Sequence, residues 1–360
     1  MARSRAATVV ASVVGVGALV AAVVGIGVWR GWFANPSVSN APRVDVPAGD
    51  VRTIARQLEA PWGLAFLPDG NALVTERDST RIVQVSPSGT VTEVQKIAEA
   101  RPSGEGGLLG IAVSPSYQSD GWVYIYYTTA EDNRIARLHL GSRPEPIFTG
   151  IPKAGNHNGG RIAFGPDGML YAGTGDAAER SRSQNRDDLG GKILRLTPDG
   201  KPAPGNPFGA NSPVHSYGHR NVQGIAWDSS GQMYASEFGQ NQYDELNRIE
   251  AGRNYGWPDV EGPSDDSRYV APIATWATSD ASPSGIAVAG NRIYMACLRG
   301  QRLYRIGLDG TGAEALFQGQ YGRLRHAAVA PDGALWVLTN NRDGRGRPSA
   351  NDDLILRLQL

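Results

Sequence analysis

The segment 155–162 (GNHNGGRI) is the stretch of the chain whose residue types best suit chemistry. Its single histidine, His157, is flanked by amides and glycines. An imidazole has an unperturbed pKa that suits accepting a proton near neutral pH, and glycines let the backbone approach a ligand closely. His157 is therefore a candidate general base. A lone histidine in a loop is more often structural than catalytic. The residues of the other loops must therefore show whether His157 belongs to a functional site.

Four further loops carry polar groups suited to binding. They are 104–110 (GEGGLLG) with Glu105, 217–224 (YGHRNVQG) with Arg220 and Asn221, 236–245 (SEFGQNQYDE) with Glu237, and 323–326 (RLRH) with Arg323 and Arg325. The two arginines of the last loop alternate and so can face one side of a strand, although arginines at strand ends are ordinary. The acidic loop can bind a hard cation such as Ca²⁺ through oxygen atoms, or it can simply be solvated. His219 and His326 are weaker candidates because neither lies in so glycine-rich a segment.

A repeated hairpin pattern predicts the elements that position these loops. In each copy an apolar strand meets a Pro-Asp-Gly-type turn and a second apolar strand follows. The copies are 64–75, 111–125, 162–171, 225–234, 286–294 and 328–336. Asp-Gly between alternating apolar runs is a strong local signal for a β-hairpin.

Each hairpin is followed by a further strand in which apolar and polar residues alternate. These strands are 81–85, 134–138, 192–196, 245–249, 302–306 and 355–358. Such units, recurring every roughly 40 to 60 residues, are typical of a propeller, whose small sheets pack around a channel because none can bury its faces alone. The sequence predicts an all-β, six-bladed β-propeller, closed by pairing of strand 354–360 with strand 51–58. A pair of β-sandwiches is the alternative.

This architecture brings the polar loops together. All of them except 236–245 enter the first strand of a hairpin, so we expect them to gather at one mouth of the channel. Cations, amides, a carboxylate and a histidine at one mouth form a site suited to an anionic, polar ligand.

The composition of the chain and the motifs it lacks argue against several other classes of protein. The 35 basic and 35 acidic residues cancel, so nothing suggests binding to nucleic acid. The single cysteine, Cys297, excludes an internal disulfide and a cysteine-based zinc cluster. The chain has no Gly-x-Ser-x-Gly elbow, no His-Glu-x-x-His motif and no P-loop.

The N-terminus predicts a membrane anchor. Arg3 and Arg5 precede an uncharged run from Ala6 to Trp29, whose 24 residues can span about 30 Å of hydrocarbon. We expect a signal anchor at 1–30, a linker at 31–50 and the propeller domain at 51–360 outside the cytoplasm. A cleaved signal peptide, which would make the protein secreted, is the alternative.

The ordered set of motifs resembles the soluble-type quinoprotein sugar dehydrogenases, the glucose/sorbosone dehydrogenase family that includes bacterial aldose sugar dehydrogenases. The resemblance runs from residue 61 to about 347. The matching motifs are 61–64 (PWGL), 75–77 (TER), 106–110 (GGLLG), 157–161 (HNGGR), 189–193 (LGGKI), 218–221 (GHRN), 255–258 (YGWP), and Arg323 with Arg325. Together these motifs are specific, although no single one is.

The resemblance implies a six-bladed propeller with pyrroloquinoline quinone (PQQ) and Ca²⁺ on one face. His157 would be the general base on the anomeric hydroxyl of an aldose, with hydride transfer to C5 of PQQ and a lactone as product. Arg220 would stabilise charge at the C5 oxygen. Asn221, Arg299, Arg323 and Arg325 would bind the cofactor. An external quinone or redox protein would then accept the electrons.

The resemblance also implies a calcium site, and two residues of this chain depart from the usual pattern of the family. Main-chain oxygens of Gly239 and Gln240 would bind the cofactor's Ca²⁺, and Glu237 and Asn247 would supply or support further ligands. Glu105, placed with the cofactor residues, stands where glutamine is common near the substrate, and Asn156 replaces an aspartate beside the base. The cofactor half of the site is therefore better supported than the sugar half.

Two other functions stay open from the sequence. One is a Ca²⁺-dependent propeller lactonase or esterase, which needs several side-chain oxygen ligands on one channel ion. The other is a non-catalytic propeller that binds glycans or a protein.

Overall fold

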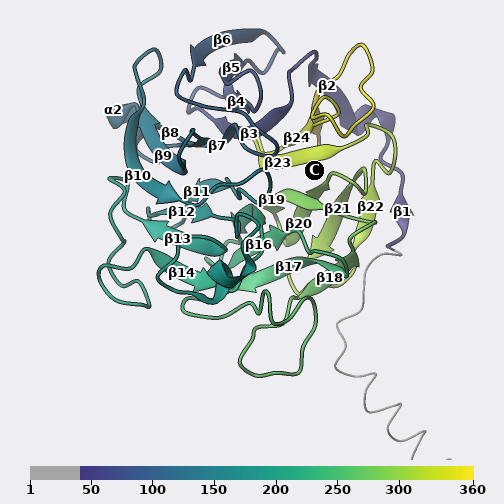
Figure 1. Cartoon of the computed structure of the whole chain (residues 1–360). Helices are drawn as coiled ribbons and strands as arrows, with labels where there is room; N and C mark the ends of the chain where they lie inside the picture. The colour runs from purple at the N-terminus through teal and green to yellow at the C-terminus, as the bar shows by residue number, and fades with distance from the viewer. Residues whose placement is uncertain (1–40) are drawn as a thin grey trace, which may run out of the picture. The chain divides into compact units, whose positions relative to one another are not determined.

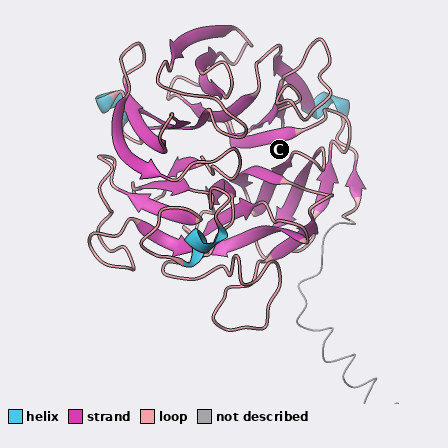
Figure 2. Ribbon diagram, in the orientation of Figure 1, coloured by secondary structure: helices cyan, strands magenta, loops and turns pink. Residues whose placement is uncertain are grey.

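The computed structural model describes residues 41–360, and almost all of its regular structure is β-strand (Figure 2). These residues form five four-stranded sheets and one five-stranded sheet. Neighbouring strands in the four-stranded sheets are antiparallel, as short hairpin connections require. The short helical pieces are η1 (Ala48–Asp50), α2 (Tyr117–Asp120) and η2 (Arg180–Gln184).

The strand that begins each predicted hairpin is the innermost strand of a sheet, and these strands meet near the centre (Figure 1). The inner strands are β3 (Pro61–Phe66), β7 (Leu108–Val113), β11 (Ile162–Phe164), β15 (Val222–Trp227), β19 (Pro283–Ala289) and β23 (Leu324–Val329). Each contacts the inner strand of the next sheet, and β23 contacts β3, so the ring is closed. This arrangement confirms the predicted six-bladed β-propeller.

Every predicted hairpin and every predicted third strand is present. The second strands are β4 (Ala72–Glu76), β8 (Val123–Thr128), β12 (Leu170–Gly173), β16 (Met233–Glu237), β20 (Arg292–Cys297) and β24 (Leu335–Thr339). The third strands are β5 (Arg81–Val85), β9 (Asn133–Leu138), β13 (Lys192–Leu196), β17 (Tyr243–Ile249), β21 (Arg302–Gly307) and β25 (Ile355–Leu358).

The outer strands have no simple repeat in the sequence. They are β6 (Val91–Lys96), β10 (Glu145–Ile151), β14 (Val214–Tyr217), β18 (Ala274–Ala277), β22 (Glu314–Leu316) and β2 (Val51–Ala55). β8 and β24 are buried along their whole length, whereas most of β6 is exposed or half-buried. A strand covered on both faces reads as a continuous apolar run, and an edge strand need not.

The ring closes as predicted, because the first strand of the propeller pairs with the last. β2 pairs antiparallel with β25, with Val51 opposite Leu358. A short strand, β1 (Arg43–Val44), also pairs in parallel with β22. The segment predicted as a linker therefore contributes to the outer edge of the fifth sheet.

Apolar side chains fill the space between neighbouring sheets. One cluster joins Leu73 and Ile82 of the first sheet to Val123 and Ile125 of the second. The last interface places Trp336 of β24 in the same cluster as Val74 of β4. Packing blade against blade fixes the positions of the loops at the ends of the inner strands.

The predicted anchor at residues 1–30 lies outside the described residues. Within residues 41–360, no helix is both long and apolar enough to cross a membrane.

Candidate active site

A cavity of about 300 Å³ lies among loops from several blades. Seven of the residues that line it were predicted as site residues: Glu105, His157, Arg220, Gly239, Gln240, Arg299 and Arg323. The propeller therefore gathers the predicted loops at one place, including the loop that follows β16, which was not expected to enter through an inner strand.

His157 is held at the wall of this cavity by a buried carboxylate. Its Nδ1 lies 2.7 Å from Oδ1 of Asp176. The other carboxylate oxygen of Asp176 accepts a hydrogen bond from Nε1 of Trp257 at 2.8 Å. Burial opposes ionisation of Asp176, but hydrogen bonds from His157, Trp257 and Ala178 outweigh it and hold the pKa of this carboxyl below its ordinary value.

An ionised Asp176 fixes the tautomer of His157. A carboxylate can only accept, so Nδ1 carries the proton and Nε2 keeps a lone pair. The side-chain amide of Asn156 lies 3.3 Å from Nε2 and can donate to it. This arrangement leaves Nε2 as the atom of His157 able to accept a proton from a ligand.

Glu105 positions the backbone of His157. One carboxylate oxygen accepts the His157 N–H at 2.9 Å, and the other lies 3.0 Å from the guanidinium of Arg345. Burial opposes ionisation of Glu105, but the His157 N–H and Arg345 together lower the pKa of the carboxyl. Glu105 was predicted as a ligand-binding residue; in the structure its carboxylate holds the main chain of the candidate base.

Two glycines, one in this loop and one in the segment packed against it, allow the backbone to pack closely. A Cβ at Gly159 (φ +63°) would collide with the backbone of Gly173 and Thr174, and a Cβ at Gly175 would collide with the carbonyl group of His157. A Cβ at Gly155, in the same loop, would meet no atom within 4 Å.

Arg220 lines the same cavity as His157, and buried residues support it. Its N–H donates to Glu237 at 2.8 Å, and its guanidinium lies 5.4 Å from the centre of the Trp257 ring. Its Nε is buried and has no hydrogen-bond partner among the described residues. Burial lowers the pKa of Arg220, and nearby carboxylates, Asp176 among them, offset this effect only in part. An anionic group in the cavity would supply the missing partner.

His219 is a structural residue. It is fully buried, its Nδ1 lies 2.8 Å from Glu237, and its Nε2 lies 2.8 Å from Ser216. The ring also stacks on Tyr255, with 4.6 Å between ring centres. Both ring nitrogens of His219 already have partners, which agrees with the prediction that His219 is a weaker candidate base than His157.

Arg323 and Arg325 face the same side of β23, as their alternation predicted. Arg323 donates two hydrogen bonds to one oxygen of Asp343, and Arg325 lies 3.9 Å from that same oxygen. Burial opposes ionisation of Asp343, but the two arginines and an N–H from Arg345 lower the pKa of its carboxyl. Asp343 therefore fixes where the charge of Arg323 lies, whereas hydrogen bonds to Gln223, Ser284 and Asn340 hold Arg325.

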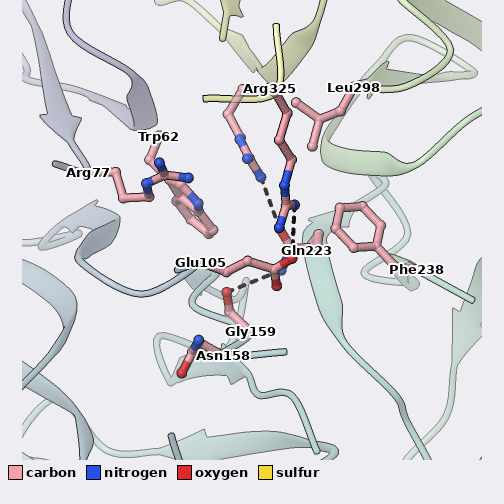
Figure 3. Close-up of a pocket in the computed structure, with 10 residues that line it drawn as sticks. Trp62, Arg77, Glu105, Asn158, Gly159, Gln223, Phe238, Leu298 and Arg325 are labelled. Carbon is pink, nitrogen blue, oxygen red and sulfur yellow. Dashed lines mark hydrogen bonds and ion pairs between the residues drawn. The ribbon is translucent and has the colours of Figure 1, made fainter. Parts of the chain in front are cut away.

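A narrower cavity lies next to the first and shares Glu105, Phe238, Leu298 and Arg345 with it. Figure 3 shows Arg325 pointing toward Gln223 in this cavity, where its guanidinium donates to Oε1 of Gln223 at 3.1 Å. Burial lowers the pKa of Arg325 to about 9.

Asn221 lies behind this narrower cavity. Its Oδ1 accepts the N–H of Gly159 at 3.0 Å, and Gly159 lines the cavity. Its Nδ2 is buried and has no hydrogen-bond partner among the described residues. An unpaired buried donor is costly, and Asn221 itself lines neither cavity.

The candidate calcium residues divide into two groups. Gly239 and Gln240 line the larger cavity, and their loop is held by Glu261, one oxygen of which accepts N–H groups from residues 240–243. Glu237 and Asn247 lie behind that loop and bond to each other at 3.0 Å. Oδ1 of Asn247 is buried without a partner in the described part of the chain.

No group of three or more His, Cys, Asp or Glu residues that could hold a metal occurs among residues 41–360. A calcium site built on main-chain carbonyl groups is a different kind of site, because it does not depend on such a cluster.

Several residues of the site were not singled out individually from the sequence. They are Asp176, Trp257, Gln223, Asp343 and Arg345, together with Arg77 and Trp62, which line the narrower cavity. Four of them lie within motifs already noted in the sequence, which are 61–64, 75–77, 217–224 and 255–258. Asp176 lies in the loop that follows strand β12. Asp343 and Arg345 belong to an irregular segment before β25 with no local pattern.

The chain is similar in sequence to known sugar dehydrogenases. A family model described as Glucose / Sorbosone dehydrogenase matches residues 58–356. The aldose sugar dehydrogenase YliI of Escherichia coli is 29% identical over 340 residues, which cover 82% of this chain and 91% of that protein. Quinoprotein glucose dehydrogenase B of Acinetobacter calcoaceticus is 31% identical over 284 residues, covering 67% of this chain and 59% of that protein.

A solved structure is similar in both sequence and fold. The PQQ-bound form of aldose sugar dehydrogenase from Streptomyces coelicolor has a TM-score of 0.83 and 53% sequence identity. The match covers 86% of this chain and 97% of that one.

Proposed function

The chain belongs to the glucose/sorbosone dehydrogenase family, and from this premise we propose that it oxidises aldose sugars at C1 with PQQ as its cofactor. The proposal rests on one observation, which is that a candidate general base and a group of positive charges border the same cavity. A His157–Asp176 pair, able to accept a proton, borders a cavity lined by several arginines.

The residues present fit PQQ, which is planar and carries three carboxylates and an ortho-quinone. Arg220, Arg299 and Arg323 line the cavity, and each can pair with a carboxylate or a quinone oxygen. The unpaired Nε of Arg220 would donate to such an oxygen, and Asn221 would support the site from behind through the N–H of Gly159. Arg325 lies deeper, already bonded to Gln223, and would add positive charge behind the site.

His157 would act as the general base. Its Nε2 would accept the proton of the anomeric hydroxyl, and Asp176 would stabilise the imidazolium that forms. PQQ, when bound, supplies the electrophilic carbonyl carbon that accepts the hydride from C1, so that the sugar leaves as a lactone. Arg220 would stabilise the negative charge that develops next to it.

Ca²⁺ is a further part of the proposal. Main-chain oxygens of Gly239 and Gln240 would bind it, and the Glu237–Asn247 pair would support their loop from behind. A bound Ca²⁺ polarises a carbonyl oxygen as a Lewis acid.

The location of the enzyme is also proposed. The uncharged run from Ala6 to Trp29 would anchor it in the cell membrane, with the propeller outside the cytoplasm and an external quinone or redox protein as electron acceptor. Carbonate extraction of membranes tests this point, since an anchored chain stays in the pellet and a cleaved one is released.

The decisive experiment is dye reduction by the purified full-length protein against a panel of aldoses. It is run with PQQ and Ca²⁺ together, with each alone, and with neither. Activity only with both additions is expected. Binding of PQQ without turnover of any aldose would refute sugar oxidation, and failure to bind PQQ would favour a non-catalytic propeller.

A further inference from the structure

The loop between β12 and β13 is folded around the side chain of one lysine. This segment, residues 174–191 and named here the Asp176 loop, carries Asp176 near its start and η2 in its middle. Lys192, the first residue of β13, follows the loop directly, and its side chain is completely buried. The loop that supplies the partner of His157 therefore encloses a basic side chain.

The amino group of Lys192 donates to three main-chain oxygens of this loop. Its Nζ lies 2.8 Å from the oxygen of Arg182, 3.2 Å from that of Ser183 and 2.6 Å from that of Gly190. A protonated amine has three N–H donors and no acceptor, so each donor meets one carbonyl group. A neutral amine would leave one of the three without its donor. The arrangement therefore fits the ammonium form.

This ammonium group has no direct counter-ion in the described part of the chain. The nearby carboxylate of Asp188 pairs with Arg182 at 2.6 Å instead. Burial lowers the pKa of Lys192 to about 7, and the charge of Asp188 offsets this effect only in part. A buried charge is costly unless hydrogen bonds compensate. The three carbonyl groups provide that compensation, so the charge and the conformation of the loop depend on each other.

The part of the loop held by Lys192 contacts the partners of the candidate base. Gln184, next to Ser183, donates from Nε2 to the main-chain oxygen of Trp257 at 2.7 Å. The indole N–H of Trp257 donates to Asp176, which in turn fixes the proton on Nδ1 of His157. A short series of contacts therefore leads from the buried ammonium group to the base.

The same part of the loop also supports Arg220. The hydroxyl group of Ser183 donates to the main-chain oxygen of His219 at 2.6 Å, and the carbonyl group of Ser183 accepts the N–H of Gly218 at 2.9 Å. His219 directly precedes Arg220, which lines the larger cavity. The carbonyl group that Lys192 holds is thus bonded to the segment that presents Arg220.

We propose that Lys192 is a positioning residue for the candidate general base. Its buried ammonium group holds the Asp176 loop in the conformation that places Asp176 and Trp257 against each other and orients His157. Lys192 lines neither cavity, so it acts only through these neighbours. The inference rests on the role of His157 in the proposed function, but its first test needs neither cofactor nor sugar.

The first test measures which ring nitrogen of His157 carries the proton. Long-range ¹H–¹⁵N spectra of the apo-protein, labelled at histidine, report this directly, and His157→Gln assigns the signals. In Lys192→Met, which keeps a long side chain but removes the donors, part of the proton should move from Nδ1 to Nε2. Lys201→Met, at an exposed position, should leave the spectrum unchanged. An unchanged His157 signal in Lys192→Met would overturn the proposal.

A second variant separates positioning from a general loss of stability. Leu194 lies two residues further along β13, is completely buried and belongs to an apolar cluster. Leu194→Ala leaves a cavity and should lower the melting temperature, as Lys192→Met does, but it does not touch the three carbonyl groups. The proton of His157 should stay on Nδ1 in Leu194→Ala. An equal change in both variants would reduce Lys192 to a structural residue.

A third variant tests the route and keeps the proposal testable if Lys192→Met does not fold. Gln184 is half-buried, and Gln184→Met removes the hydrogen bond to Trp257 while Lys192 stays in place. The His157 signal should change in the same direction as in Lys192→Met. A His157 signal identical to that of the wild type would refute the route through Trp257, whatever Lys192→Met shows.

Kinetics of the enzyme loaded with PQQ complete the test. In Lys192→Met, kcat should fall by up to about 10²-fold, the scale of a displacement of about 1 Å at a catalytic group. Wild-type kcat together with a displaced proton on His157 would refute the positioning role. Absence of turnover in the wild type would refute the proposed function instead, and the spectra of the apo-protein would still decide the role of Lys192.

Discussion

His157 and Asp176 form a hydrogen-bonded pair with 2.7 Å between Nδ1 and Oδ1. Asp176 is completely buried and is shared with Trp257, whose indole N–H donates to its second oxygen. With Trp257, the pair forms a unit of three side chains from separate parts of the chain. Its orientation therefore depends on residues that need not contact the sugar.

Asp176→Asn should lower kcat by about 10²–10⁴-fold, because an amide can no longer fix the proton on Nδ1 of His157. PQQ affinity should change little, since Asp176 does not line either cavity. Steady-state kinetics and PQQ titration check the two parts. In the double variant with His157→Ala, the losses should not add, because the two residues act as one unit. Additive losses would contradict this coupling.

Arg345→Gln should alter sugar preference without altering stability. Its side chain is 59% exposed and pairs with Glu105, so the ion pair contributes little to folding. Removing it leaves the Glu105 carboxylate uncompensated beside His157. The ratio of kcat/KM for glucosamine to that for glucose should rise roughly two- to fivefold, the scale of one partly screened charge pair. Adding Glu105→Gln should return the ratio toward that of the wild type, and an unchanged ratio in both variants would remove Glu105 from the sugar site.

Asp343→Asn should destabilise the apo-protein by about 1.5–3 kcal/mol at pH 7, because hydrogen bonds to a charged partner are lost. The pKa of Asp343 is lowered in the folded state, so its contribution is present above the ordinary aspartate pKa and is lost as the pH falls below about 4. Urea unfolding between pH 3 and pH 7 should therefore show a shallower acid loss in the variant. Parallel pH curves for the two proteins would contradict the assignment.

Gly239→Ala and Gln240→Ala form a matched pair for the calcium proposal. A Cβ at Gly239 would collide with the main-chain oxygen of Tyr243, so this variant must shift the loop. Gln240→Ala keeps both the carbonyl group and the N–H that donates to Glu261. Added Ca²⁺ should raise the melting temperature of the wild type and of Gln240→Ala, because an ion bound only by the folded state stabilises it.

The same stabilisation should be absent from Gly239→Ala. Differential scanning fluorimetry with Ca²⁺ and with a chelator measures all three proteins. A Ca²⁺ response that persists in Gly239→Ala would place the ion elsewhere.

Much of the fold could be predicted from the sequence because its signals are local. The turn at Pro68-Asp69-Gly70 and the alternation in 81–85 each depend on a few neighbouring residues, and their sixfold recurrence predicts the ring. Apart from β2, the outer strands, such as β6, were not predicted individually. They are short or exposed on one side and so carry little apolar pattern.

The candidate site, too, was only partly predictable from the sequence. The sequence by itself determined the residue types available, with His157, Arg220 and Arg323 in loops that enter the inner strands. The tertiary structure alone decided their partners, because Glu105 and Arg345 are 240 positions apart and Asp176 and Trp257 are 81 apart. No local pattern encodes such pairs; they arise only when blade packs on blade and the ring closes.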